Sequence, residues 1–222
     1  MTRFKQLASV AAIATVTFLA GAPASATVIL TFGQNGTADT ITGTNNGSGS
    51  TTISGTNISV SITQIDGLLL TPFNAFFTLS ATSVGAASSS GGFISQDYSG
   101  TFCFTSVAGC GNGVNYLSGS FTDATFGTGA SLTMSGAEPP GTVSFTSDVI
   151  NDLDVPRGMS FSFANVNPLL HIVNGSIASF HSSVSGTLSG SETTHENPEP
   201  ATLGLLGIAL AGLGFARRRP RS

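Results

Sequence analysis

Few residues of this 222-residue chain have the types and spacing of a catalytic site. His171, His181 and His195 do not form an H-E-x-x-H metal motif, and no serine stands in the G-x-S-x-G pattern of a nucleophile elbow. A Ser-His-Asp triad built from distant residues gives no recognisable signal in a serine-rich chain. The sequence therefore predicts a protein that is not an enzyme and has no cofactor, with His171 and His181 as surface or strand residues.

One acidic segment has the chemistry of a calcium site. Asp148, Asp152 and Asp154, with Asn151 among them, place oxygen ligands on an expected loop. The spacing lacks the glycine and the distal glutamate of an EF-hand loop. A solvated turn is favoured, and the three carboxylates are a weak calcium candidate.

The two cysteines, Cys103 and Cys110, lie close together in the chain. Outside the cytoplasm such a pair indicates a disulfide. There is no C-x-x-C redox motif, and two thiols are too few ligands for a metal site. We expect a structural disulfide that stiffens a local turn.

The charges of residues 27–196 are strongly unbalanced. Arg157 is the one basic side chain against ten acidic ones, which gives a formal charge of −9. Such a segment does not bind nucleic acid or anionic headgroups through charge. It also contains no lysine, which excludes Schiff-base and P-loop chemistry.

The N-terminus has the order of a secretory signal peptide. Arg3 and Lys5 precede an uncharged apolar stretch at 7–20, and Ala24-Ser25-Ala26 supplies an A-x-A cleavage pattern. We expect a signal peptide at residues 1–26, cut by signal peptidase so that the mature chain starts at Thr27. An uncleaved anchor is the alternative, but the apolar stretch is short for a membrane span.

Between the ends, apolar residues alternate with Ser and Thr. One face of residues 73–81 is Phe, Ala, Phe, Leu and Ala, and residues 58–62 alternate in the same way. Turn pairs such as Asn35-Gly36 and Asp66-Gly67 separate the runs. The pattern predicts an all-β fold, an antiparallel β-sandwich-like single domain over 27–188, with a solenoid as the alternative.

Three polar segments between the two ends are expected to lack regular structure. Residues 43–55 and 85–92 are rich in Gly, Ser and Thr, which favours exposed loops. Residues 189–197 have the composition of a polar linker.

The C-terminus, residues 198–222, combines three features. Pro198-Glu199-Pro200 precedes an uncharged apolar run at 201–216, and the basic residues that close the chain are Arg217, Arg218, Arg219 and Arg221. As a helix the run would be about 24 Å long, against a hydrocarbon core of about 30 Å. We expect a short transmembrane helix at residues 201–216, followed by arginines that act as a basic stop on the cytoplasmic side.

Residues 197–221 resemble the PEP-CTERM sorting signal of Gram-negative bacteria, in the order tripeptide, apolar span and basic cluster. The resemblance implies that an exosortase, an integral-membrane cysteine peptidase, recognises and cuts the tail. It also implies transient anchoring in the inner membrane and a final place at the cell surface or outside the cell. A plain tail anchor is the alternative, and the tripeptide distinguishes the two.

Three functions remain open for the region between the two signals. The leading hypothesis is a non-enzymatic surface or matrix protein associated with exopolysaccharide, biofilm or floc. The second is a carbohydrate-binding module, for which the lack of Trp and the presence of only Tyr98 and Tyr116 are unfavourable. The third is a secreted hydrolase.

Overall fold

The computed structural model describes residues 26–128, 132–151 and 153–191, which fall within one compact unit, Ser25–Thr193. The all-β prediction is confirmed, because these residues form antiparallel strands and contain no helix. The strands are β1 (Ala26–Gln34), β2 (Ile41–Asn45), β3 (Thr51–Ile65), β4 (Leu68–Ser83), β5 (Ser88–Ser90), β6 (Phe93–Thr105), β7 (Asn115–Thr128), β8 (Leu132–Glu138), β9 (Thr142–Thr146), β10 (Asp154–Asn167), β11 (Ile172–Val173), β12 (Ser176–Ile177) and β13 (Phe180–Ser191).

The main sheet closes on itself. β1 and β2 follow each other in one strand position between β13 and β3, and β8 and β9 do the same beside β7. The positions run β1/β2, β3, β4, β6, β7, β8/β9, β10 and β13, and β13 pairs with β1 again. Each position is therefore bonded to the positions before and after it in the chain.

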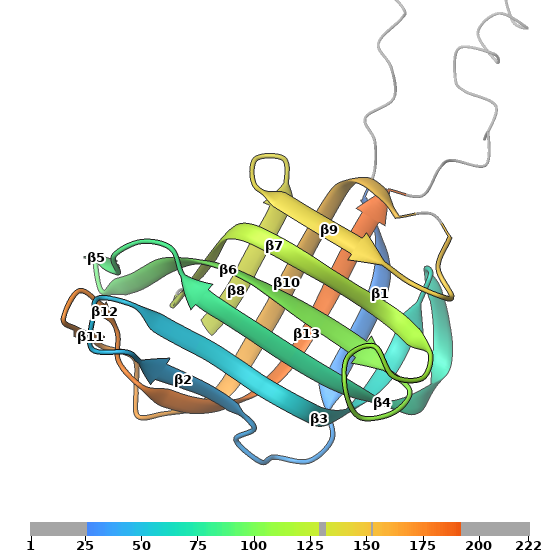
Figure 1. Ribbon diagram of the computed structural model, residues 1–222, viewed down its shortest axis with the longest axis horizontal. Coiled ribbons are helices and arrows are strands. Elements are labelled where there is room, and N and C mark those ends of the chain that lie inside the picture. Colours follow the sequence, from blue (N-terminus) through green and yellow to red (C-terminus); the bar gives the residue numbers. More distant parts are fainter. Residues whose placement is uncertain (1–25, 129–131, 152, 192–222) are drawn as a thin grey trace, which may run out of the picture. The chain divides into compact units, whose positions relative to one another are not determined.

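This closed sheet refines the sandwich-like expectation. One continuous sheet replaces two separate ones, and it is flattened, so that β3, β4, β6 and β7 cross over β8, β10 and β13 at a steep angle (Figure 1). Strands with one buried face show the same alternation in both architectures. The sequence pattern alone could not separate them.

Aromatic side chains fill the interior. The rings of Phe32, Phe77, Phe104, Phe102 and Phe161 form one group, with contacting centroids between 4.7 and 6.0 Å apart. All five residues are buried, as the alternation predicts. A closed sheet of eight strand positions has an interior that side chains just fill. The inside is therefore a packed core, and the outward face consists mainly of Ser and Thr.

The polar segments expected as loops are partly strand. Residues 43–55 form the end of β2, a short turn and the start of β3, and Gly43 leaves the space that the ring of Phe180 occupies. Residues 85–92 are mostly exposed turn and loop, as expected, and contain the short β5. Of the linker expected at residues 189–197, residues 189–191 belong to β13 and pair with β1, and residues 192–197 lie outside the described residues. Backbone pairing to neighbours holds these small polar residues in strands despite their weak propensity.

The first and the last described residues of the chain lie at the same end of the closed sheet. With eight antiparallel positions, the last strand returns to the end where the first began, and Ala26 lies opposite Ser191. The connections β3–β4, β6–β7 and β9–β10 share this end, which we call the terminal end. The opposite end carries β5 and the β11–β12 hairpin (Figure 1).

Candidate functional site

Paired hydroxyls cover the outer face where β7 meets β9. The alternation places Ser118, Ser120 and Thr122 outward on β7, each opposite an outward hydroxyl of β9. The oxygen–oxygen distances are 2.8 Å for Ser118–Thr146, 2.7 Å for Ser120–Ser144 and 2.6 Å for Thr122–Thr142. Each hydroxyl can donate one hydrogen bond and accept two, so a paired hydroxyl keeps unused capacity on its solvent side.

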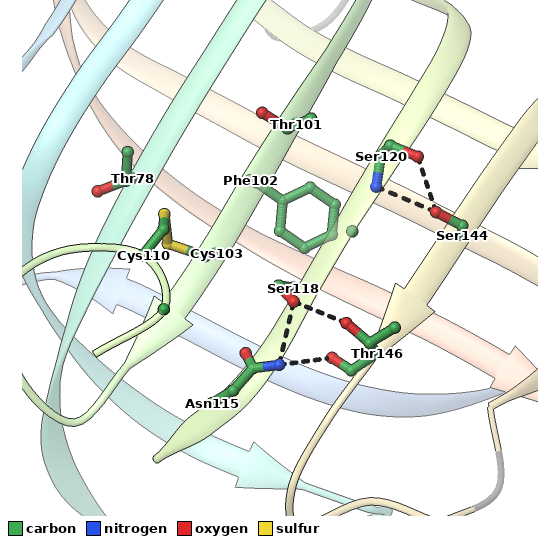
Figure 2. A pocket seen from close by; sticks show the side chains of 12 residues that line it. Thr78, Thr101, Phe102, Cys103, Cys110, Asn115, Ser118, Ser120, Ser144 and Thr146 are labelled. Carbon is green, nitrogen blue, oxygen red and sulfur yellow. Dashed lines mark hydrogen bonds between the residues drawn. A yellow bond between two sulfur atoms is a disulfide. The ribbon is translucent and has the colours of Figure 1, made fainter. Parts of the chain in front are cut away.

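A shallow groove of about 430 Å³ runs beside these pairs (Figure 2). Gly119 lies on the groove floor between Ser118 and Ser120, and only glycine fits there, because a Cβ would meet the carbonyl of Ser144 and the buried rings of Phe102 and Phe145. Asn115 closes one end by donating from Nδ2 to Ser118 Oγ and to the Thr146 carbonyl. The lining residues are Thr78, Thr101, Phe102, Cys103, Cys110, Gly111, Asn115, Ser118, Gly119, Ser120, Ser144 and Thr146.

The predicted disulfide forms one wall of the groove. Cys103 and Cys110 are bonded, with their Cα atoms 5.9 Å apart. Cys103 points outward from β6, yet it is only 3% exposed, because the β6–β7 connection folds back over it. The backbone N–H of Gly109 donates to Asn57 Oδ1 at 2.7 Å, which fixes this connection to β3. The wall is therefore tied to the sheet at two points.

A second polar cluster lies inside the sheet, near the end opposite the termini. Tyr98 donates from its hydroxyl to Gln96 Oε1 at 3.2 Å, and the backbone N–H of Ile177 donates to the same oxygen at 3.1 Å. Gln96 Nε2 in turn donates to Ser176 Oγ and to the Gly85 carbonyl. Burial raises the pKa of the Tyr98 phenol well above its usual range. Because the polar groups of this cluster form hydrogen bonds with one another, we assign it a structural role in the interior and not a role in ligand binding.

Two of the three weak calcium candidates lie in the described residues. Asp148 accepts the backbone N–H of Asn115 at 2.8 Å, and Asp154 lies in β10 opposite Ser191. Asp152 lies outside the described residues. Among the described residues no three metal-binding side chains come together.

The two described histidines are exposed on separate segments. His171 Nδ1 is 3.0 Å from the Leu169 carbonyl, and His181 Nδ1 is 3.3 Å from Thr42 Oγ1. Neither ring forms an ion pair with a carboxylate of the described part of the chain.

Most sorting residues fall outside the described residues. These are Ala24, Pro198, Glu199, Pro200, Arg217, Arg218, Arg219 and Arg221. Ala26, the last residue expected in the signal peptide, is the first residue of β1. Across 26–128, 132–151 and 153–191, no helix has the length and apolar character to cross a membrane.

The family comparison identifies the tail. Residues 198–219 match the family model of the PEP-CTERM protein-sorting motif, which confirms the resemblance seen in the sequence. No curated protein and no solved structure matches the chain. The motif implies an exported protein that an exosortase sorts to the surface or the exterior of the cell.

Proposed function

The chain carries a PEP-CTERM protein-sorting motif at residues 198–219. From this premise we propose that it is a non-enzymatic surface or matrix protein that associates with exopolysaccharide. In this proposal the tail anchors the chain transiently in the inner membrane of a Gram-negative bacterium before the exosortase cuts it. The groove on the outer face of β6, β7 and β9 then contacts the polysaccharide. The observation that carries the proposal is the set of hydroxyl and amide groups that line this groove.

The chemistry of the groove suits a neutral, hydroxyl-rich polymer. Ser, Thr and Asn side chains both donate and accept hydrogen bonds, as sugar hydroxyls do. Ser120 and Ser144 are exposed on neighbouring strands, and each hydroxyl keeps hydrogen-bonding capacity beyond their mutual bond and the bond from the Ser120 N–H to Ser144 Oγ. The volume lies within the range of sites for small ligands, which is enough for a few sugar units of a chain that passes through.

Binding in this groove would depend on hydrogen bonds and not on aromatic stacking, because Phe102, the one aromatic lining residue, is only 3% exposed. Tyr98 is completely buried, and Tyr116 is half-buried with its ring 5.1 Å from that of Phe73. Hydrogen bonds exchanged with water give only about 1 kcal/mol each, so one groove binds weakly. Many displayed copies on one polymer would hold it firmly through multivalency.

The test compares two matched pairs of serines. Ser120→Ala with Ser144→Ala removes a pair in the groove, and Ser135→Ala with Ser160→Ala removes an outward pair that is directly opposed on β8 and β10. The measurement is retention of the exported protein by purified exopolysaccharide of the producing bacterium. Loss of two bonds of about 1 kcal/mol each predicts roughly tenfold or greater weakening for the groove variant alone. Equal retention of both variants would contradict the proposal.

A further inference from the structure

Exposed apolar side chains collect at the terminal end of the closed sheet. The described residues include eleven large hydrophobic side chains that are exposed, and seven of them lie in the connections or strand starts of this end. Leu68 and Leu69, at 65% and 84% exposed, form the tip of the β3–β4 hairpin. The seven are Leu68, Leu69, Leu70, Val107, Val114, Val149 and Val155.

The leucine tip is held in place. Asp66 and Gly67 form its two-residue turn, with φ of 52° and 71°, as the Asp-Gly pair predicts. Their backbone N–H groups donate to the carbonyls of Ile29 and Val28 at 2.8 and 3.1 Å. The tip is thus fixed against the first residues of β1, beside the point where the described chain begins and ends.

The length of the tail places this end near a membrane. Ser191 ends β13 at the terminal end, and nine residues, 192–200, separate it from the apolar run at 201–216. Fully extended, nine residues span roughly 30 Å. While the run is inserted in a bilayer, the terminal end can therefore be no farther than about this distance from the point of insertion.

We propose that the terminal end is a bilayer-contacting surface, with Leu68, Leu69 and Leu70 inserted among the headgroups while the tail is anchored. This inference rests on the proposed anchoring. Asp66, Asp148 and Asp154 lie at the same end, and Arg157 is paired with Glu138 at 3.1 Å. The contact is therefore apolar and suits zwitterionic lipid better than anionic lipid.

The lack of tryptophan in the chain allows a direct test. Leu69→Trp places a single fluorophore on the tip, and Leu169→Trp is its control at the opposite end, since the two leucines are 84% and 81% exposed. Each full chain, with its tail intact, is reconstituted into vesicles of phosphatidylcholine that carries brominated acyl chains. Flotation first selects the protein that is anchored, and quenching by bromine is then measured on that fraction.

We expect most of the Leu69→Trp emission to be lost and the Leu169→Trp emission to be unchanged. Added phosphatidylglycerol should reduce the quenching of Leu69→Trp. Equal quenching of the two variants, or none in either, would overturn the inference. A chain that does not float would overturn the anchoring as well, and flotation reports that failure separately. Leu68→Trp is the second probe of the tip if Leu69→Trp does not fold.

Discussion

Alkaline pH should destabilise this protein through one buried phenol. Tyr98 is completely buried, and burial raises the pKa of its hydroxyl well above the usual range. In the unfolded chain the same group titrates near pH 10. The stabilisation is therefore fully present below about pH 10 and is lost as the pH rises above that value, since the unfolded state then releases a proton that the folded state keeps.

The magnitude follows from this difference in protonation. Between pH 10 and pH 11 a single phenol of this kind lowers the free energy of unfolding by about 1 kcal/mol, and by about 1.4 kcal/mol for each further pH unit while it stays protonated in the fold. Few other basic groups can titrate in this alkaline range, because residues 27–196 contain no lysine and one arginine. The disulfide-bonded cysteines do not titrate.

The assay compares the exported wild-type protein with Tyr98→Phe by urea unfolding at several pH values. The variant loses the bond to Gln96 Oε1, but that oxygen keeps the Ile177 N–H and the Ser176 hydroxyl, so a loss of about 1 kcal/mol at neutral pH is expected. Above pH 10 the stability of the wild type should fall more steeply than that of the variant. Tyr116 is present in both proteins, so its contribution cancels. Parallel curves for the two proteins would refute the reasoning.

Three further outcomes are expected. Replacing Cys103 and Cys110 by Ala should lower the free energy of unfolding by about 2–3 kcal/mol, from the entropy of a short loop, and intact mass with and without reductant should show the bond in the wild type. Gly119→Ala should lower the free energy of unfolding by about 1–3 kcal/mol in thermal or urea unfolding, because the added Cβ overpacks the site. Gly33→Ala, with open space around its Cβ position, should lower it less. Equal losses of stability in the two variants would contradict the close approach at Gly119. Alanine at all three positions of Pro198-Glu199-Pro200 should keep the full-length chain in the inner membrane, and recovery of surface material that still contains the apolar run would show a plain anchor instead.

Strand positions were predictable because burial of one face imposes a period of two. Phe77 and Leu79 on β4 are buried as the alternation requires. The period of two is broken at Ile29, which is buried together with its neighbour Leu30, because a bulge between Val28 and Leu30 shifts the register of β1. A bulge depends on backbone pairing to a distant strand, which local sequence does not encode.

The groove was not predicted from the sequence. Its hydroxyls come from four strands that are separated in the chain: Thr78 on β4, Thr101 on β6, Ser118 and Ser120 on β7, and Ser144 and Thr146 on β9. The matching alternation of residues 118–122 and 142–146 was the available signal, but many Ser/Thr runs of this chain look alike. Which run lies beside which is set by closure of the sheet, a property of the whole fold. The disulfide was predictable because two cysteines allow one pairing.

The pairing of Ala26 with Ser191 determines how the folded unit responds to mechanical load. Tension applied across the two ends would peel β1 from β13 one hydrogen-bonded pair at a time, which is the weak direction of an antiparallel ladder. Tension applied to the C-terminal end alone, against a polymer held on β7 and β9, has no such path, because the load must pass through β10 and β8 between them. The fold would thus open readily when both chain ends are pulled apart, and would resist when only the C-terminal end is pulled.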